Sequence, residues 1–405
     1  MMKRRLVAIA AGAALLAPCF VSQLAFAQAN RPIKIALIAS KTGPSEQYAR
    51  DTERGLRLGL DYMTQGTWTV NGRKIELIVK DDQMKPELSK AMLTEAFADD
   101  KADLAVGTSW SGGALAMAPV AQEYKKILML EPAIADSLTG AAWNRYLFRA
   151  SRNSFQDALA TAAVLKDGDT IAFLAADYVY GKDGVAAFKE ALAATKRKVN
   201  IVQEEFIPMT TSDFTSSMQR IQDKLKGATG KKYVAVIWGA PNPIRKLADL
   251  LPAGSDISLL SLGGANHENL KPWTGLPVAG GIYYFYTFPK NPMNDWFVAE
   301  SEKRYKVPPD LFSAGGFVTA AAIIDGIKKA GSTDSEKLIA AMEGMEFNTP
   351  KGKMTFRKED HQAMQAQYAF TVKKTPGKRG EMDLLDLVRE IPASEMPVPV
   401  KASPK

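Results

Sequence analysis

A serine on a short loop is the first candidate for chemistry in this chain. Gly107-Thr108-Ser109-Trp110-Ser111 follows an apolar segment and precedes a helical pattern, which is the setting of a hydrolase nucleophile. That turn needs glycine two residues after the serine, because a side chain does not fit there, and this chain has Ser111. A triad also needs a histidine, and the two available, His267 and His361, fit ordinary surface positions better. A serine hydrolase is therefore the weakest of the alternatives.

Metal and phosphate chemistry lack a sequence pattern as well. Two isolated histidines and a single cysteine, Cys19, supply no set of metal ligands. Acid pairs such as Asp81-Asp82 are typical of solvated loop ends. The segment 227–232 has neither the spacing nor the hydroxyl residue of a Walker motif, and GxGxxG does not occur. The sequence thus predicts no catalytic residue, no metal site and no cofactor.

Strand and helix patterns alternate along most of the chain. The run from Ile33 to Ser40 is almost continuously apolar, as expected for a parallel strand covered on both faces. A second series of strands and helices begins near Asp157. Two such series predict an α/β protein with two lobes, each a doubly wound and mostly parallel sheet. Ligands of these sheets bind beyond the carboxyl ends of the strands, so the loops there should hold the binding residues.

The last third departs from this alternation. Gly281 to Phe288 predicts a strand, and helical patterns follow to about residue 342. Lys353–Phe356 and Gln367–Val372 then predict a β-hairpin. Residues 392–405 are rich in Pro, Ala and Lys and predict a flexible tail.

The first 27 residues have the features of a cleavable signal peptide. A charged start, Lys3-Arg4-Arg5, precedes an apolar run that ends in Ala25-Phe26-Ala27, so Gln28 should begin the mature chain. An uncleaved anchor is the alternative, which the interrupting Pro18 disfavours. No later segment is apolar for the ~20 residues that a membrane helix needs, so we expect a soluble protein in the periplasm.

Cysteine content, charge and length further limit the kinds of protein and partner that the sequence allows. Cleavage would remove Cys19, whose lipidation is disfavoured because Pro18 stands where a small residue is expected. The net charge is +8, three of the positive charges lie in the leader, and no basic stripe carries aromatics. Nucleic acid is therefore not an expected partner, whereas an anionic ligand fits the charge. The roughly 375 remaining residues exceed one core and predict two domains.

Six short motifs in a fixed order resemble a known family. Together they are similar to the type I periplasmic solute-binding proteins of ABC importers, the branched-chain amino-acid (Leu/Ile/Val)-binding group. The resemblance covers nearly the whole mature chain. The motifs are Thr42-Gly43-Pro44 with Gln47-Tyr48 and Gly55, Phe148-Arg149 with Asp157, Tyr180-Gly181-Lys182-Asp183-Gly184, Asp213-Phe214, Leu262-Gly263-Gly264, and Ala330-Gly331-Ser332-Thr333-Asp334.

The resemblance implies a type I fold whose two lobes are joined by three crossovers, near residues 149, 283 and 349. The N-terminal lobe would hold 28–148 with 284–349, and the C-terminal lobe 149–283 with 350–391. The resemblance also implies that the protein is not an enzyme. Closure of the lobes would capture a ligand, and the closed form would dock on the permease of an ABC importer. We expect a monomer.

The resemblance also places a ligand site on the strand-end loops. The loop Ser109-Trp110-Ser111 would offer hydroxyl and backbone donors to a carboxylate, at the N-terminus of the next helix. Aromatic side chains would form the walls, although simple packing also explains Tyr48 and Tyr180. The predicted ligand-binding set is Tyr48, Ser109, Trp110, Ser111, Ala133, Ile134, Tyr178, Tyr180 and Asn266.

Two positions depart from the family pattern and bear on the ligand. The loop after the fourth strand has Ala133 in place of the usual threonine, and Ala265 stands where amino-acid binders have glutamate. A buried ammonium without an acid partner costs several kcal/mol. We therefore expect an aromatic or aliphatic carboxylate without an α-amine, unless Glu268 or Asp177 replaces the missing acid. A branched-chain amino-acid binder and a ligand sensor remain the alternatives.

Overall fold

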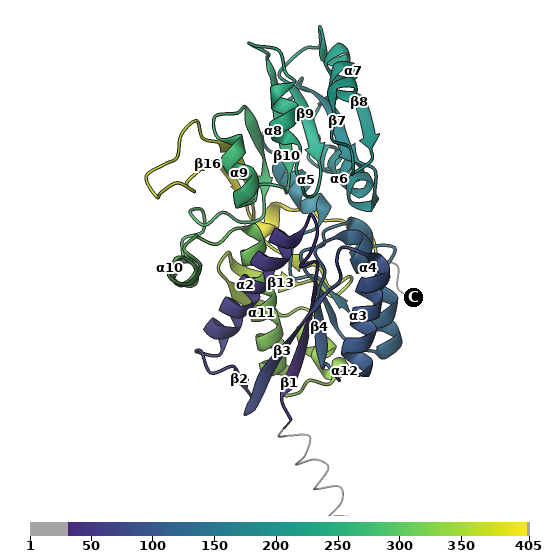
Figure 1. The fold of residues 1–405 in the computed structure, drawn as a ribbon, viewed down its shortest axis with the longest axis vertical. Helices are drawn as coiled ribbons and strands as arrows, with labels where there is room; N and C mark the ends of the chain where they lie inside the picture. The colour runs from purple at the N-terminus through teal and green to yellow at the C-terminus, as the bar shows by residue number, and fades with distance from the viewer. Residues whose placement is uncertain (1–30, 403–405) are drawn as a thin grey trace, which may run out of the picture.

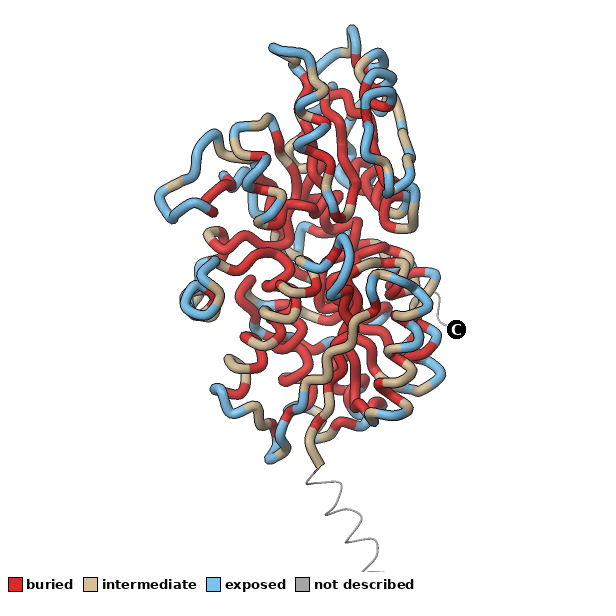
Figure 2. Tube along the Cα trace, viewed as in Figure 1, coloured by how far each residue is buried: buried red, intermediate tan, exposed pale blue. Residues whose placement is uncertain are grey.

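The computed structural model describes residues 31–402, and the predicted signal peptide lies outside this range. The chain forms two lobes, one above the other in Figure 1, each built on its own sheet. Buried segments follow the strands of both sheets and continue through the region that joins the lobes (Figure 2). The expected two-lobed α/β fold is confirmed.

The first lobe is built on a six-stranded sheet in the order β2-β3-β1-β4-β5-β6. All its pairs are parallel except β2 with β3. β1 is buried almost throughout because helices cover both faces of the sheet. The elements are β1 (Ile33–Ala39), α2 (Glu46–Met63), β2 (Thr69–Val70), β3 (Arg73–Asp81), α3 (Pro86–Ala98), β4 (Leu104–Gly107), α4 (Ser111–Tyr124), β5 (Leu128–Leu130), η1 (Asp136–Thr139) and β6 (Leu147–Phe148).

The second lobe is built on a seven-stranded sheet in the order β16-β15-β11-β10-β9-β7-β8. Strands β7 to β11 pair in parallel, whereas β15 and β16 join antiparallel. The elements are α5 (Ser154–Ala162), β7 (Thr170–Ala176), α6 (Val179–Ala194), β8 (Asn200–Ile207), α7 (Thr215–Leu225), β9 (Lys232–Ile237), α8 (Ile244–Asp249), β10 (Ile257–Leu262), α9 (His267–Trp273), β11 (Val278–Ile282), β15 (Gln367–Val372) and β16 (Leu385–Ile391), followed by η2 (Ala393–Glu395).

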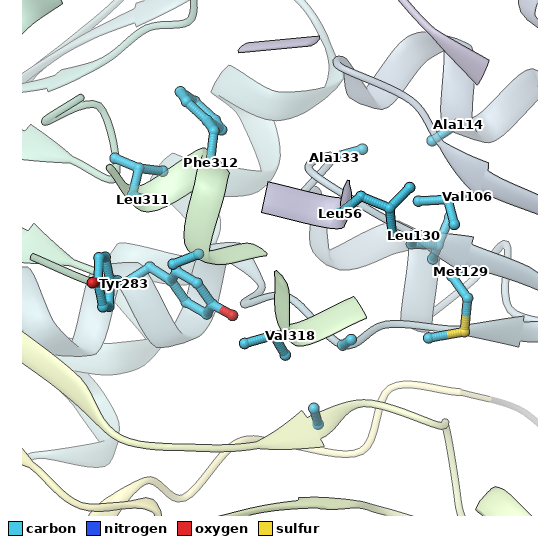
Figure 3. Packing of buried hydrophobic residues seen from close by; sticks show 14 of the residues in the cluster. Leu56, Val106, Ala114, Met129, Leu130, Ala133, Tyr283, Leu311, Phe312 and Val318 are labelled. Carbon is cyan, nitrogen blue, oxygen red and sulfur yellow. The ribbon is translucent and has the colours of Figure 1, made fainter. Parts of the chain in front are cut away.

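The chain returns to the first lobe through three helices, α10 (Pro292–Tyr305), α11 (Leu311–Ala330) and α12 (Ser335–Met342). α11 packs closely along α2 because both helices carry glycine at the contact. A Cβ at Gly55 would lie 1.8 Å from the carbonyl oxygen of Ser313. Figure 3 shows part of this core, with Leu56 of α2 near Val106 of β4.

α11 is the one described helix whose length and composition would allow it to cross a membrane. We expected no such segment after the leader. About nine-tenths of its apolar window is buried inside the protein, against α2 and the sheet. It is therefore the central core helix of the first lobe.

The predicted hairpin of 353–356 with 367–372 is wrong. β13 (Gly352–Phe356) pairs with β12 (Glu346–Thr349) and β14 (Ala363–Met364) in a separate three-stranded sheet. β15 pairs with β11 and β16 instead. After the three-stranded sheet the chain joins the seven-stranded sheet at β15, which begins at Gln367.

The predicted strand Gly281–Phe288 is also largely wrong. β11 ends at Ile282, and the segment 283–288 passes between the lobes with its aromatic rings buried. The rings of Phe288 and Tyr368 lie 5.5 Å apart, centroid to centroid. The nearly continuous run of aromatic residues here reflects packing between the lobes, where aromatic pairs stabilise the joining segment, and not a strand.

The predicted flexible tail is ordered along the described residues up to 402. Met396 and Val398 are buried among residues of the second lobe's core, and Arg357 donates to the carbonyl of Val398. The ammonium of Lys401 lies 3.0 Å from the carboxylate of Asp136 and also bonds Glu190 of α6. These apolar and charged contacts hold a segment whose composition suggested disorder.

Candidate functional site

A cavity lies where the two lobes face each other. It opens beyond the carboxyl ends of β4 and β5 in the first lobe and of β7, β9 and β10 in the second, as expected for parallel sheets. Most of the wall is aromatic or apolar. It is lined by Tyr48, Ser109, Trp110, Ser111, Pro132, Ala133, Ile134, Arg152, Tyr178, Tyr180, Trp238, Gly239, Gly263, Gly264 and Phe312.

The loop after β4 is held in place by a buried carboxylate. Asp82, which follows β3 and is fully buried, accepts hydrogen bonds from the hydroxyls of Ser40, Ser89 and Thr108. These bonds join three segments of the first lobe behind the loop. They fix Ser109 and the start of α4 before any ligand arrives, which reduces the entropy lost on binding.

Ser109 and Ser111 both present hydroxyl groups to the cavity. Ser109 Oγ accepts the backbone N–H of Ser40 at 3.2 Å, and Ser111 Oγ accepts that of Ala135 at 3.2 Å. Each hydroxyl keeps its own hydrogen for donation to another acceptor. α4 begins at Ser111, so its first N–H groups and the positive end of its dipole lie at the same place. This end of the cavity suits an anion.

Trp110 lies flat over the first turn of α4. The contact requires glycine, because a Cβ at Gly112 would lie 2.6 Å from the indole ring and one at Gly113 would lie 2.7 Å from its nitrogen. The indole N–H is buried and has no hydrogen-bond partner among the described residues. The indole ring is thus fixed against the start of α4.

Two aromatic pairs form opposite walls. Tyr48 of α2 stacks on Phe312 of α11, with ring centroids 4.0 Å apart, and both belong to the first lobe. Tyr178 and Tyr180 of the second lobe meet edge to face at 5.9 Å. The hydroxyl of Tyr180 donates to the carbonyl of Leu262 at 2.8 Å, which fixes the ring. Flat rings on both sides favour a flat or apolar ligand body between them.

Arg152 is the one charged side chain that lines the cavity, within the described part of the chain. It is nearly fully buried and bonds Asp157 at 3.1 Å and the carbonyl of Gly263 at 3.3 Å. Burial opposes its charge, but Asp157 and Glu131 raise the pKa of Arg152 above its ordinary value. A permanent cation therefore lies in the wall of the cavity.

The structure brings eight of the nine predicted residues to this cavity and leaves out Asn266. Asn266 begins α9, where its side chain accepts the N–H of Asn269. Its amide also lies 3.1 Å from the amide of Gln47, so it joins the lobes beside the cavity. The ligand-binding role of the other eight remains a prediction.

Neither acid considered as a substitute for the missing glutamate lines the cavity. Asp177 is half exposed and pairs with Lys182 at 2.9 Å. Glu268 is exposed and faces Arg50 at 4.0 Å, in a second inter-lobe cavity. That cavity also contains Asp51 and His267 and lies on the far side of the contact between Asn266 and Gln47.

Neither histidine lines the cavity that contains Ser109, the nucleophile of the hydrolase alternative. His361 is buried and not at the surface as we expected; it stacks on Phe148 and lies 3.0 Å from the carbonyl of Leu147. His267 lines the second cavity. Ser109 therefore has no histidine beside it in the cavity lining, within residues 31–402.

Seven residues that line the cavity do not belong to the predicted set. The rule that ligands bind at the carboxyl ends of parallel strands selected Ser109. It also applies to the end of β9, where it could have selected Trp238 and Gly239. Phe312 carries no such signal, because it lies in the first turn of α11, far along the chain from its ring partner Tyr48. The missed residues are Pro132, Arg152, Trp238, Gly239, Gly263, Gly264 and Phe312.

Comparisons with known proteins agree with this geometry. Residues 32–379 match the family model described as periplasmic binding protein. A Leu/Ile/Val-binding protein homologue of Brucella melitensis is 25% identical over 353 residues, which cover 84% of this chain and 88% of that protein. A solved ABC-type branched-chain amino acid transporter from Rhodopseudomonas palustris is 54% identical, with a TM-score of 0.80, and covers 92% of this chain and 100% of its own.

The chain therefore belongs to the periplasmic binding protein family. More specifically, it is a solute-binding protein of an ABC transporter, of the branched-chain amino-acid group, and not an enzyme. Another solved relative, from Rhodopseudomonas palustris BisB5, is 26% identical with a TM-score of 0.77 and covers 91% of this chain and 99% of its own. That protein was solved in complex with 3,4-dihydroxybenzoic acid.

Proposed function

We propose that this protein captures a small carboxylate with an aromatic or aliphatic body and no α-amine, for import by an ABC transporter. The observation that carries the proposal is the composition of the cavity wall. It contains one cation, Arg152, and no carboxylate within residues 31–402, and the rest is largely aromatic. A single negative charge finds a partner there, whereas a ligand ammonium does not.

The ligand would lie with its carboxylate between Arg152 and the Ser109–Ser111 loop. Its body would lie between the Tyr48–Phe312 pair and the Tyr178–Tyr180 pair. Contacts from both lobes would stabilise the form in which the lobes meet, and that form would dock on the permease. The 26% identical relative supports this proposal, because its bound 3,4-dihydroxybenzoic acid is an aromatic acid without an amine.

A branched-chain amino-acid binder is the second candidate. It is favoured by the descriptions of the relatives, including the 54% identical transporter protein. This candidate requires an acid to face the ammonium, and Glu268 and Asp177 both lie outside the cavity. The two candidates therefore differ in the sign of charge that they require around the ligand's α-carbon.

Calorimetry with matched ligand pairs distinguishes them. Leucine would be compared with 4-methyl-2-oxopentanoate, and phenylalanine with phenylpyruvate and benzoate. We expect the acids to bind about 10²–10³-fold more tightly than the amino acids, because an unpaired buried charge costs about 3–5 kcal/mol. Micromolar binding of leucine with no binding of the acids would overturn the proposal in favour of the amino-acid candidate.

A further inference from the structure

Glu131 lies directly behind the cavity wall, and its carboxylate is unpaired. It follows β5 and precedes Pro132 and Ala133 of the wall, and its side chain is 1% exposed. Both carboxylate oxygens lack a hydrogen-bond partner among the described residues. A Cβ at Gly315 would lie 2.0 Å from Oε1, so the carboxylate lies against the backbone of α11. Burying an unpaired carboxylate is costly, so its retention here calls for a function.

Charged and polar groups from several segments act on the Glu131 carboxylate. Arg152 of the first crossover attracts its negative charge, Asp310 at the start of α11 repels it, and the nearby hydroxyl of Ser151 favours the charged form without a hydrogen bond of normal geometry. Lys351 also attracts it, although burial lowers the pKa of that ammonium well below its usual range. Lys351 is held by Gln365 at 2.7 Å and by the carbonyl of Ala366, close to the ring of Tyr283.

Arg152 is the link between Glu131 and the cavity. Its guanidinium bonds Asp157 and also feels the charge of Glu131, without a direct salt bridge to Glu131. A ligand carboxylate beside Arg152 would therefore be the third acid around one guanidinium. Three carboxylates around one cation in a buried site repel one another strongly, so one of them should become neutral.

We propose that Glu131 takes up a proton from solvent when an anionic ligand binds, so that the ligand and the proton are captured together. This inference rests on the proposed function, in which Arg152 is the partner of the ligand carboxylate. The proton binds to a carboxylate oxygen of Glu131, and no other bond forms or breaks. The ligand cancels the attraction that Arg152 exerts on the negative form of Glu131, and the neutral acid is then the stable form.

The ionisation of Glu131 falls in the range where such uptake is measurable. Burial raises the pKa of Glu131 to about 7, against the opposing charge of Arg152. The bound state holds more protons than the free state, so affinity should increase as pH falls through this range, by at most about tenfold per pH unit. A simple carboxylic acid ionises near pH 4 and contributes no change above pH 6.5.

Asp51 is the group that could imitate this effect, because burial and Asp310 also raise its pKa to about 7. It lines the second cavity and not the ligand cavity. Asp51→Asn is therefore the matched control for Glu131→Gln, since each variant replaces a buried carboxyl by an amide of the same shape.

The test is calorimetry with benzoate and 4-methyl-2-oxopentanoate at pH 7.5, in phosphate and in Tris, whose ionisation enthalpies differ. We expect wild type and Asp51→Asn to take up a fraction of a proton, up to one, per ligand. Their affinity should fall about 3- to 10-fold per pH unit from pH 7 to 8.5, whereas Glu131→Gln should show neither effect.

Binding of an acid to wild type without proton uptake overturns this inference and leaves the proposed function intact. Uptake that persists in Glu131→Gln or disappears in Asp51→Asn also overturns it. Absence of binding by both acids overturns the proposed function, and this inference with it. If Glu131→Gln fails to fold, the two-buffer measurement on wild type and Asp51→Asn still decides.

Discussion

Arg152 pairs with Asp157 within the protein and, in the proposed function, with the ligand carboxylate, and mutation can separate these two roles. Arg152→Gln removes the cation and leaves Asp157 fully buried without its partner. Breaking one side of a buried ion pair costs about 3–5 kcal/mol, so the free energy of unfolding should fall by that amount. The double variant Arg152→Gln with Asp157→Asn no longer leaves a charged Asp157 without its partner, so most of this stability should return.

Ligand binding should not return in the double variant. The ligand carboxylate loses its only cationic partner in both variants, which again corresponds to about 3–5 kcal/mol, or about 10²–10³-fold in the dissociation constant. The hydroxyls of Ser109 and Ser111 remain and should retain weak binding. The loss of stability is thus expected in one variant, and the loss of affinity in both.

Two measurements check this prediction. Urea unfolding gives the stability of wild type and both variants, and calorimetry with phenylpyruvate gives their affinities. Arg245→Gln, which removes an exposed ion pair on α8, serves as the control for a lost positive charge. If the double variant folds and binds phenylpyruvate as tightly as wild type, Arg152 only supports the fold, and its proposed contact with the ligand carboxylate is refuted.

Four further outcomes are expected. Trp110→Phe should reduce the change in tryptophan fluorescence on ligand binding, and an unchanged signal with unchanged affinity would make this indole structural. Burial lowers the pKa of His267 to about 4, so stability should decrease as pH falls from 6.5 towards 4, by on the order of 2 kcal/mol; His267→Gln should remove this slope in urea unfolding. Deletion of residues 392–405 removes the buried side chains of Met396 and Val398 and uncovers the apolar surface on which they pack, so it should lower the free energy of unfolding by about 3 kcal/mol, whereas Lys401→Ala should cost less than about 1 kcal/mol. Mass spectrometry of the exported protein should give Gln28 as its first residue, and a chain beginning elsewhere would contradict the predicted cleavage site.

The sequence contained enough information to predict the two lobes and most of the loops around the cavity. A continuous apolar strand such as β1 can only be buried between two layers of helices, and the carboxyl ends of such strands must face one edge. For this reason Ser109, Trp110 and the residues after β5 were found without a structure. The same rule does not predict which strands pair when antiparallel segments are added late, as with β13 and β15.

The contacts between distant segments were decided only by the tertiary structure. Arg152 belongs to a crossover, where no periodic pattern distinguishes a binding residue from a buried ion pair. Phe312 faces Tyr48 only because α11 packs along α2. The composition of the tail predicted flexibility, because composition does not show that another part of the folded chain offers an apolar surface for Met396 and Val398 to pack against. Local pattern thus determined the strands and their loops, whereas the charge of the ligand site depended on which buried groups the folded chain brought together.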